Sequence, residues 1–483
     1  MISENGASEF AGKRVAVIGL AATGLATARV LRDKGARVCI YDAKPESALS
    51  PERVVAARSL GDGVMLALDN APVDWDQTDL VIPSPGVGRS AAPLAEALRR
   101  GVPILGEIEV AYRIAKAPIL AITGTNGKTT TTALLGAICR ESGRHTWVAG
   151  NIAEDAGVRL PLIEAAALAP LDGVIVAEIS SFQLEWVLGF RPRVAAWLNI
   201  ANDHLDRHND FDEYAGAKAR LFAAQGASDT AVLNADDGEV IRYSQSVGSG
   251  EQWLFSVRET VARGTYLDGE TLLSVLPGES PRPLMTRDEI PLPGLHNVAN
   301  VLAASAMALA FGIDAPVIRR AVQQFPGVAH RLETVATIDG VRYINNSMCT
   351  NPAAVAASLE AAGGRPVVAI AGGKHKGGDL GPMVTALHDR TRSIILIGES
   401  APEIGHALLQ ETAKTGTGPE IAYAKTLESA VERAADTAQA GDIVMLIPGC
   451  ASFDMFTGFE HRGQVFRDAV KALPRKKLEE SKV

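Results

Sequence analysis

Gly124-Thr125-Asn126-Gly127-Lys128-Thr129-Thr130 is the stretch that decides the fold, and it directly follows the apolar run Pro118 to Ile122. An apolar strand that leads into a Gly-rich turn ending in Lys-Thr wraps backbone N–H groups around a polyphosphate. The Lys then reaches the outer phosphates, and the Thr hydroxyl binds Mg²⁺. Ile122 stands where the general G-x-x-x-x-G-K-[ST] pattern has its first Gly, so the loop is a variant. The stretch predicts ATP or GTP binding, and an ordinary Gly-rich strand-to-helix turn is the simpler alternative.

Short apolar strands alternate with Ala-rich helical stretches along the chain, a pattern typical of parallel α/β sheets. We therefore expect an α/β protein with three domains: a Rossmann-like domain over residues 1–106, a central P-loop ATPase-type parallel sheet over 107–327, and a second Rossmann-like domain over 328–483. The segment between Gly248 and Pro293 is rich in Gly and Pro and is predicted to be less regular. The expected strands are Arg14–Gly19, Val38–Asp42, Leu80–Pro83, Val174–Glu178, Ala195–Ile200, Ala231–Asp236, Val367–Ala371, Ile394–Gly398 and Ile443–Ile447.

Composition narrows the class of protein. The 483 residues carry a net charge of -9, and Lys and Arg are scattered along the chain, which argues against nucleic-acid binding. The N-terminus is polar, and no apolar run approaches the roughly 18 residues that a membrane span needs. The four cysteines lie far apart without a C-x-x-C spacing, so free thiols are expected. We expect a cytoplasmic monomer whose partners are small molecules.

The first domain begins like a dinucleotide-binding unit. Gly19-Leu20-Ala21-Ala22-Thr23-Gly24 follows the first strand, and Asp42 ends the second. Ala21, however, occupies the position where a second Gly lets the backbone approach a pyrophosphate, so tightly bound NAD is not favoured. Two interpretations stay open: a domain that binds the nucleotide part of a substrate, and a purely structural βαβ unit.

The central domain carries polar clusters after its strands. Glu178 ends one strand, and the next leads into Asn199-Ile200-Ala201-Asn202-Asp203-His204-Leu205-Asp206-Arg207-His208. The carboxyl ends of parallel strands are where such sheets bind ligands, so Glu178 and His204 are candidate Mg²⁺ ligands. Because Mg²⁺ prefers oxygen, a hydrogen-bonding role for His204 is an equal alternative. Lys218 reads, from the residues alone, as a solvated helix lysine.

These motifs occur together and in order, and the chain resembles the Mur ligases. The resemblance extends from the Gly19 turn to Phe466 and includes Gly294-Leu295-His296-Asn297-Val298-Ala299-Asn300 and His330-Arg331. It implies an ATP-dependent amide ligation in which the substrate's alanyl carboxylate attacks the γ-phosphate of ATP to give an acyl phosphate. The amine of D-glutamate then displaces phosphate, and the acceptor is UDP-N-acetylmuramoyl-L-alanine.

The resemblance also assigns residues to the reaction. Catalytic roles are implied for Lys128, His204 and Lys218, with Lys218 carbamylated so that it becomes an oxygen ligand. Carbamylation needs an amine of lowered pKa and therefore a partly desolvated site. Two Mg²⁺ ions are implied. Thr129 and Glu178 would hold the first, and His204 and Lys218 would hold the second. The implied ATP-binding residues are Gly124, Thr125, Asn126, Gly127, Lys128, Thr129, Thr130, Asn297 and Arg331, together with His330.

The resemblance also implies which residues bind the substrates. Those implied for the UDP-muramoyl substrate are Thr23, Asp42, Ser84, Gly86, Asn151 and His204, although Ala149-Gly150-Asn151-Ile152-Ala153 lacks the family's flanking glycines. Those implied for the incoming amino acid are Thr350, Lys376, Ser452 and Phe459. Lys376 would pair with a glutamate carboxylate, and either Lys374 in its place or a mobile surface lysine is the alternative.

One motif departs from the family. Asn345-Asn346-Ser347-Met348-Cys349-Thr350-Asn351 stands where relatives usually show Asp-Ser-Lys-Ala before Thr-Asn, so Asn346 replaces the Asp and Met348 replaces the Lys. An acid and a base are lost together, which suggests a swapped ion pair rather than an inactive site. A preference for L-glutamate or another amino acid stays open, as does a nucleotide-binding regulatory protein without catalysis.

We also expect hinges near Gly106 and Gly327.

Overall fold

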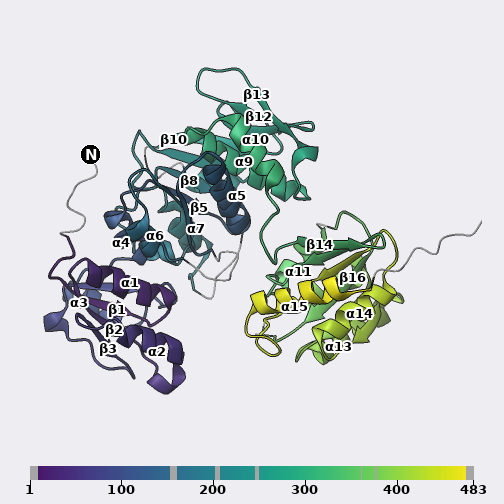
Figure 1. Cartoon of the computed structure of the whole chain (residues 1–483), viewed down its shortest axis with the longest axis horizontal. Coiled ribbons are helices and arrows are strands. Elements are labelled where there is room, and N and C mark those ends of the chain that lie inside the picture. Colours follow the sequence, from purple (N-terminus) through teal and green to yellow (C-terminus); the bar gives the residue numbers. More distant parts are fainter. Residues whose placement is uncertain are drawn as a thin grey trace, which may run out of the picture. The chain divides into compact units, whose positions relative to one another are not determined.

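The computed structural model describes residues 9–152, 160–201, 207–244, 248, 250–360, 362–375, 377 and 379–474. The chain divides into two compact units, Met1–Phe325 and Pro326–Val483 (Figure 1). Three largely parallel sheets with helices between their strands confirm the predicted α/β fold. The domain boundaries expected at residues 106 and 327 stay predictions.

The first sheet has four parallel strands in the order β3-β2-β1-β4. A glycine is required where helix α1 packs on the turn after β1, because a Cβ at Gly24 would lie 2.1 Å from the carbonyl oxygen of Gly19. This close packing brings the turn and the first residues of α1 together at the carboxyl edge of the sheet. The elements are β1 (Arg14–Ile18), α1 (Ala22–Asp33), β2 (Arg37–Tyr41), η2 (Glu46–Ala48), α2 (Pro51–Arg58), β3 (Val64–Ala67), η3 (Trp75–Gln77), β4 (Leu80–Pro83) and α3 (Ala92–Arg100).

The second sheet has nine strands in the order β13-β12-β11-β10-β9-β8-β5-β7-β6. Strands β5 and β7 lie inside the sheet, are apolar up to their last residue and are buried at every position, as expected of a sheet covered on both faces. The elements are α4 (Glu107–Ile114), β5 (Ile119–Thr123), α5 (Lys128–Glu141), β6 (Thr146–Gly150), α6 (Leu162–Leu168), β7 (Val174–Glu178), η4 (Gln183–Trp186), β8 (Val194–Trp197), α7 (Phe211–Ala219), β9 (Thr230–Asn234), α8 (Gly238–Ser244), β10 (Glu251–Ser256), β11 (Gly264–Asp268), β12 (Thr271–Val275), β13 (Arg282–Thr286), η5 (Arg287–Glu289), α9 (Leu295–Ala310) and α10 (Ala315–Gln324).

The expectation of an irregular segment between Gly248 and Pro293 is wrong, because this segment forms strands β10 to β13. A tight turn at Gly269, which has a φ of +58°, joins β11 to the antiparallel β12. Pro283 lies in β13, the edge strand of the sheet, where a missing N–H costs no ladder hydrogen bond. The Gly and Pro residues that suggested irregularity therefore mark a hairpin and an edge.

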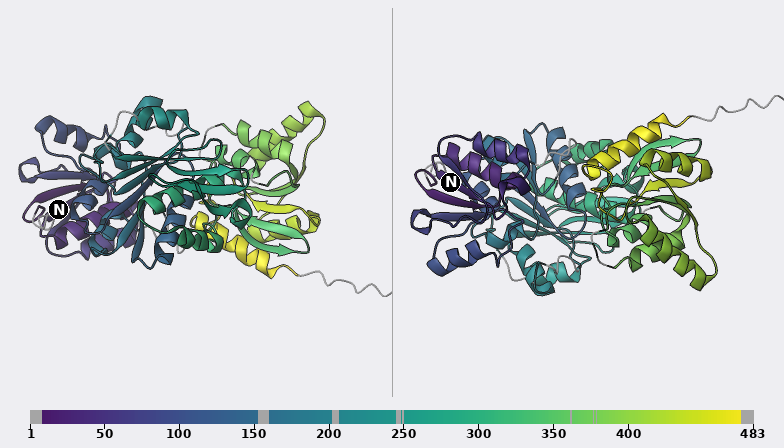
Figure 2. Two further views of the ribbon diagram at one scale, coloured as in Figure 1. Left: turned by 90° about the horizontal axis from the view of Figure 1, so that it is seen from above. Right: turned by 90° about the horizontal axis from the view of Figure 1, so that it is seen from below.

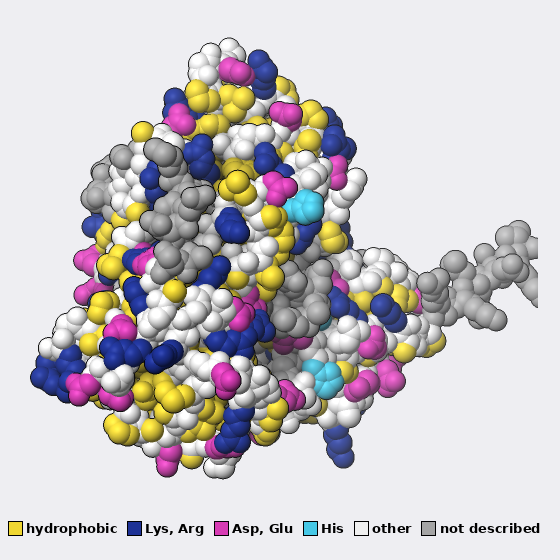
Figure 3. Space-filling view, turned by 60° about the vertical axis from the view of Figure 1, so that its left-hand side comes forward, with side chains coloured by type: hydrophobic (Ala, Val, Ile, Leu, Met, Phe, Trp, Pro, Cys, Tyr) yellow, Lys and Arg dark blue, Asp and Glu magenta, His cyan; other side chains and the backbone are white. Residues whose placement is uncertain are grey.

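Helices cover both faces of the large sheet. Helices α5, α9 and α10 pack together on one face, and α4 and α6 pack together on the other (Figures 1 and 2). Helix α1 of the first sheet contacts α6, so the two sheets of this unit are joined through helices. In Figure 3 the Lys and Arg side chains are interspersed with Asp and Glu, in agreement with the scattered charges of the sequence. Within the described ranges, no helix combines the length and apolarity needed to cross a bilayer.

The second unit contains one six-stranded sheet in the order β14-β15-β19-β16-β17-β18, parallel except for the pairing of β14 with β15. Its apolar strands β16 and β19 are buried at every position. The elements are β14 (Glu333–Ile338), β15 (Val341–Asn345), α11 (Ala353–Glu360), β16 (Val367–Gly372), α12 (Gly381–Arg390), β17 (Thr391–Ile397), α13 (Ala401–Thr415), β18 (Glu420–Tyr423), α14 (Leu427–Thr437), β19 (Ile443–Leu446) and α15 (Phe459–Ala472).

A buried carboxyl group joins helix α4 to helix α6. Glu107 is 3% exposed, and its Oε1 accepts a 2.7 Å hydrogen bond from the backbone N–H of Ile163. Burial raises the pKa of Glu107 from 4.5 to about 7, against the lowering effect of the N–H groups of Ile163 and Leu162. Between these two values the folded state binds more protons than the unfolded state. The contribution of Glu107 to stability is therefore highest below pH 4.5 and is lost as the pH rises through 7.

We expect Glu107→Gln to stabilise the first unit at pH 8 and to change its stability little at pH 5. The gain at pH 8 has an upper bound of about 3 kcal/mol, since one pKa unit corresponds to about 1.4 kcal/mol. Thermal unfolding of both proteins, followed at the two pH values, measures the difference. An equal shift at pH 5 and pH 8 would contradict ionisation of Glu107 as the cause.

Candidate active site

The Gly-rich loop lies at the carboxyl end of β5, directly before α5. Gly124 and Gly127 have φ values of +152° and +82°, which L side chains rarely adopt. The Lys128 Nζ donates 2.8 Å hydrogen bonds to the carbonyl oxygens of Gly124 and Thr125, so its ammonium group lies over the loop. The Asn126 N–H donates to Asn199 Oδ1 at 2.8 Å, which ties the loop to the end of β8. This is the geometry of a loop that encloses an anion.

Oxygen ligands for a cation lie beside this loop. Thr129 Oγ1 donates to Glu178 Oε2 at 2.8 Å, and Asn151 Nδ2 donates to Glu178 Oε1 at 3.0 Å. Neighbouring ligands of an octahedral Mg²⁺, each about 2.05 Å from the ion, lie about 2.9 Å apart. The hydroxyl of Thr129 and the carboxylate of Glu178 therefore fit Mg²⁺ in chemistry and in spacing. Within the described part of the chain, no three His, Cys, Asp or Glu side chains form a group that could hold a metal ion by themselves.

Lys218 reaches the same loop from helix α7. Its side chain is 2% exposed, and its Nζ donates a 2.9 Å hydrogen bond to the carbonyl oxygen of Gly124. The Nζ also lies 4.6 Å from the ring centroid of Tyr214, whose hydroxyl lies 3.1 Å from Thr125 Oγ1. The interpretation of Lys218 as a solvated lysine is therefore wrong, since the group is desolvated and beside the loop.

A recess of about 560 Å³ lies between the ends of β9 and β10 and the start of α9. Its lining includes Asp236, Asp237, Arg258, Leu295 and His296. Helix α9 is tied to the loop's own helix, because Thr131 Oγ1 on α5 lies 3.3 Å from Asn300 Oδ1.

Asn297, which was expected to contact the nucleotide, is 7% exposed at the start of α9. Its Nδ2 donates to the carbonyl oxygen of Pro293 at 2.7 Å, and its Oδ1 accepts from Asn300 at 3.2 Å. Its amide therefore holds the first turn of α9 beside the recess.

The positions implied for the UDP substrate gather at the carboxyl edge of the first sheet. Asp42 accepts the N–H of Leu20 at 2.8 Å and so closes the turn after β1. Ser84 Oγ donates to the carbonyl oxygen of Gly19 at 2.9 Å, which joins the turns after β1 and β4. Thr23 lies in the first turn of α1, where no side chain caps the helix, and Gly86 follows β4. Asn151, by contrast, lies with Glu178 in the central sheet.

Three positions implied for the amino acid converge in the second unit, at the carboxyl edge of its sheet. Ser452 is buried after β19, Phe459 begins α15, and Thr350 follows β15. The carbonyl oxygen of Phe459 accepts a 2.7 Å hydrogen bond from Ser347 Oγ. Arg331, expected at the nucleotide, also lies in this second unit, whereas the Gly-rich loop lies in the first. Two predicted residues, His204 and Lys376, lie outside the described residues.

The sequence interpretation missed a buried arginine behind these positions. Arg462 on α15 is fully buried and donates to Ser347 Oγ at 3.0 Å and to the carbonyl oxygens of Ser347 at 2.9 Å and Cys450 at 3.1 Å. Burial lowers its pKa to about 10, so it remains a cation at neutral pH. Only its folded neighbours reveal this role, because an arginine inside a helix gives no separate sequence signal. Asn199 and Asn300, also missed as individual residues, lie in motifs that the sequence analysis did single out.

The departing motif has a structural explanation at Asn346. This side chain is 4% exposed, its Oδ1 accepts from the N–H of Leu332 at 3.1 Å, and its Nδ2 donates to Ser358 Oγ at 2.9 Å. Ser358 in turn donates to the carbonyl oxygen of Ala354 at 2.7 Å. The amide thus holds Leu332, a non-glycine residue with a φ of +47°, next to Arg331. The swapped ion pair suggested for Asn346 and Met348 stays a prediction.

Asn346→Asp is expected to destabilise the second unit by about 1 kcal/mol or more, because the carboxylate cannot donate to Ser358 and a buried acceptor is left unpaired. Asn351→Asp is the matched control, since Asn351 is exposed and its Oδ1 only accepts from Ala354 N. Thermal unfolding of the two variants compares them directly. Equal stability of the two variants would contradict the role of the Asn346 amide as a donor.

Comparison with known families covers most of the chain. Residues 13–106 match the family domain described as "Mur ligase MurD-like, N-terminal domain", residues 122–308 match "Mur ligase middle domain", and residues 330–450 match "Mur ligase, glutamate ligase domain". Among solved structures, the fold is similar to UDP-N-acetylmuramate-alanine ligase MurC from Thermotoga maritima, with a TM-score of 0.59 and 19% identity over 95% of this chain and 99% of that chain. It is also similar to MurF from Acinetobacter baumannii, with a TM-score of 0.58 and 19% identity over 90% of this chain and 91% of that chain.

Curated relatives are more similar in sequence. The UDP-N-acetylmuramoylalanine--D-glutamate ligase of Pelotomaculum thermopropionicum is 44% identical over 96% of this chain and 99% of its own length. The ligase of the same name from Koribacter versatilis is 41% identical over 96% of this chain and 98% of its own length. With this identity over nearly the full length and matches to all three domains, the chain belongs to the Mur ligase family.

Proposed function

We propose that this protein ligates D-glutamate to UDP-N-acetylmuramoyl-L-alanine at the expense of ATP. The observation that supports ATP chemistry is the placement of Lys128, Thr129, Glu178 and Lys218 around one Gly-rich loop. The choice of substrates rests on relatives of 38% to 44% identity that bear the name of this ligase.

The proposed reaction has two steps. A carboxylate oxygen of the alanyl group attacks the γ-phosphorus of ATP, the bond from that phosphorus to the β-phosphate oxygen breaks, and ADP leaves. The amine nitrogen of glutamate then attacks the acyl carbon, loses a proton and expels inorganic phosphate, which leaves an amide. A free carboxylate is a poor acyl donor, so the phosphoryl group serves to make one of its oxygens a leaving group.

The chain's own residues would act mainly by position and charge. The N–H groups of the loop and the Lys128 ammonium would surround the phosphates, where they offset charge that develops during transfer. Thr129 and Glu178 would hold one Mg²⁺, and Lys218 as its carbamate, with His204, would hold a second. Bound Mg²⁺ supplies electrostatic stabilisation of the phosphate oxygens. The recess lined by Asp237, Leu295 and His296 would receive the adenine base. Arg331 would contact the nucleotide.

The two other substrates would bind at the remaining sheet edges. The nucleotide end of the UDP substrate would bind at the turns that Asp42 and Ser84 hold. Thr23 at the start of α1 and Gly86 after β4 would contact it there. Glutamate would bind among Thr350, Lys376, Ser452 and Phe459. The Arg462 guanidinium would fix the backbone around this site, because it forms hydrogen bonds with both Ser347 and Cys450.

The test is phosphate release from ATP and Mg²⁺ in the presence of UDP-N-acetylmuramoyl-L-alanine. We expect release that requires both this acceptor and D-glutamate, with little release when L-glutamate or no amino acid is added. A preference for L-glutamate would contradict the proposed stereochemistry and would place the Asn346 and Met348 departure at the specificity site. No release with any amino acid would favour a nucleotide-binding protein without catalysis.

A further inference from the structure

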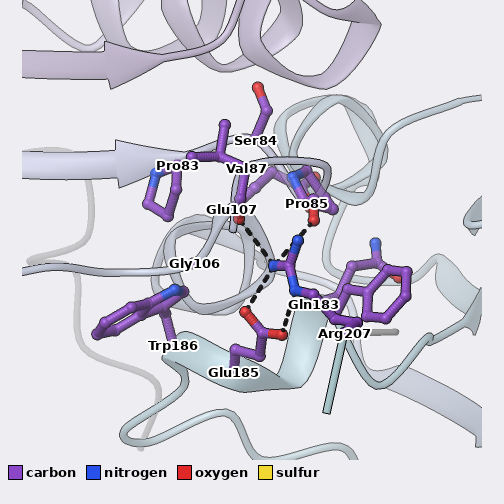
Figure 4. A pocket seen from close by; sticks show the side chains of 11 residues that line it. Pro83, Ser84, Pro85, Val87, Gly106, Glu107, Gln183, Glu185, Trp186 and Arg207 are labelled. Atoms are coloured by element: carbon purple, nitrogen blue, oxygen red, sulfur yellow. Dashed lines mark hydrogen bonds and ion pairs between the residues drawn. The ribbon is translucent and has the colours of Figure 1, made fainter. Parts of the chain in front are cut away.

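Arg207 makes a buried ion pair at the junction of the two sheets in the first unit (Figure 4). Its Nε donates to Glu185 Oε1 at 2.9 Å, and its Nη2 donates to Glu185 Oε2 at 2.7 Å. The side chain of Glu185 is 2% exposed and that of Arg207 is 16% exposed. The guanidinium carbon also lies 5.0 Å from the ring centroid of Phe182, so the cation is held by an aromatic face as well as by the carboxylate.

The same guanidinium reaches the first sheet. Its Nη2 donates to the carbonyl oxygen of Val87 at 2.7 Å and lies 3.4 Å from that of Pro85. In Figure 4 the guanidinium lies between the carboxylate of Glu185 on one side and the segment after β4 on the other. One side chain of the central sheet therefore fixes the backbone of the segment that contains Ser84 and Gly86.

Helix η4 makes further contacts with the first domain. The guanidinium of Arg89 lies 5.2 Å from the ring centroid of Trp186, and the N–H of Gly106 donates to the carbonyl oxygen of Trp186 at 2.7 Å. Arg89 also approaches Glu213 on α7 at 3.4 Å, but its side chain is 44% exposed, so this ion pair contributes little. Arg29 on α1 also pairs with Glu164 on α6, but 51% of the arginine side chain is exposed. The Arg207–Glu185 pair differs in being buried and bidentate.

A buried ion pair is weak evidence for stability, because the cost of desolvation is comparable to the attraction between the charges. What a guanidinium does provide is a planar fork whose N–H directions fix the position of each acceptor. Here the acceptors lie on helix η4 and on the segment after β4, and the distance between these two parts must stay fixed during ligation. Helix η4 follows Glu178 by only a short turn, and the segment after β4 contains two positions proposed to bind the UDP substrate.

We propose that Arg207, held by Glu185, is a positioning residue that sets the UDP-substrate segment at residues 84–87 relative to the phosphoryl-transfer site. The inference rests on the proposed function. It assigns no chemical step to Arg207, which acts through the backbone of Pro85 and Val87. Loss of the fork would leave the ATP site intact and let the UDP substrate bind with its alanyl carboxylate displaced from the γ-phosphate.

Arg207→Lys tests the proposal because it keeps the charge but removes the fork. We expect kcat/KM for UDP-N-acetylmuramoyl-L-alanine to fall on the order of tenfold, which corresponds to about 1.4 kcal/mol, with part of the loss in kcat because the carboxylate is displaced, while the KM for ATP stays the same. In the free protein, amide hydrogen exchange in residues 84–91 should become faster. Glu185→Asp, which shortens the carboxylate, should act in the same direction if Arg207→Lys folds poorly.

Arg191→Lys is the matched control. Arg191 also holds a buried carboxylate, that of Asp229, but this pair lies within the central domain and contacts no residue of the segment after β4 in the described part of the chain. The control should change neither kcat/KM nor hydrogen exchange in residues 84–91. Unchanged exchange in both Arg207→Lys and Glu185→Asp would overturn the proposed fixing of the segment. Faster exchange with an unchanged kcat and an unchanged KM would overturn the role in substrate positioning, whereas an inactive wild-type protein would contradict the proposed function itself.

Discussion

Lys128→Ala is expected to lower the rate of ligation by about a thousandfold, the largest effect of any single substitution proposed for this chain. In the structure the Lys128 ammonium lies over the Gly-rich loop, donating to the carbonyl oxygens of Gly124 and Thr125. When the loop holds a polyphosphate, this charge would face the oxygens that become more negative during transfer. A factor of a thousand corresponds to about 4 kcal/mol of transition-state stabilisation, the size expected for one well-placed charged donor.

Phosphate release with ATP, acceptor and D-glutamate measures this effect. Lys116→Ala is the control, because Lys116 is an exposed lysine just before β5 and takes no part in the loop. The control should retain the wild-type rate, and both variants should unfold at the wild-type temperature within a few degrees. A Lys128→Ala rate within tenfold of wild type would show that the Lys128 ammonium does not act on the transferred phosphate.

The central sheet illustrates what sequence patterns reveal well. Strands β5 and β7 were predictable because each is a continuous apolar run, and a loop with Gly, Lys and Thr follows the first of them. The pairing of Thr129 with Glu178 was also predictable in outline, since the carboxyl ends of neighbouring parallel strands meet at one edge. Strands β10 to β13 were missed because Gly and Pro usually indicate loops, whereas here they form a tight turn and an edge strand.

The contacts that could not be predicted are those made across domains and in the buried interior. Nothing in the sequence near Arg207 shows that its guanidinium reaches the carbonyl oxygen of Val87, since the contact depends on how two sheets pack. Lys218 is a second example, in which the local sequence alone misleads about burial. Its neighbours in sequence suggest a solvated helix lysine, whereas the resemblance to the Mur ligases implies a partly desolvated one. The fold shows that the ammonium group is buried and bound to Gly124 of the loop.

Lys218→Ala is expected to lower ligation by at least about a hundredfold, and excess bicarbonate should not restore it, because the variant lacks the nitrogen that binds CO₂. The ammonium first loses a proton to become an amine, whose Nζ bonds to the carbon of CO₂. Loss of a second proton then leaves a carbamate, which is a carboxylate-like ligand. Lys218 is buried and hydrogen-bonded to Gly124 of the loop that precedes Thr129, and a carbamate there would provide an oxygen ligand for a second Mg²⁺. Carbon-13 NMR with labelled bicarbonate should show a carbamate signal in the wild-type protein and in Lys116→Ala, but not in Lys218→Ala.

Lys218→Arg separates this role from a structural one. A guanidinium can still donate to the carbonyl oxygen of Gly124, as the lysine does at 2.9 Å, but it stays protonated and does not form a carbamate. If Lys218 only supports the loop, the Arg variant should keep most of the activity that the Ala variant loses. If the carbamate is the working form, both variants should be equally impaired, while the unfolding temperature of the Arg variant should remain closer to that of wild type. Near-normal ligation by Lys218→Ala would rule out both roles, because neither the donor to Gly124 nor the oxygen ligand would then be needed.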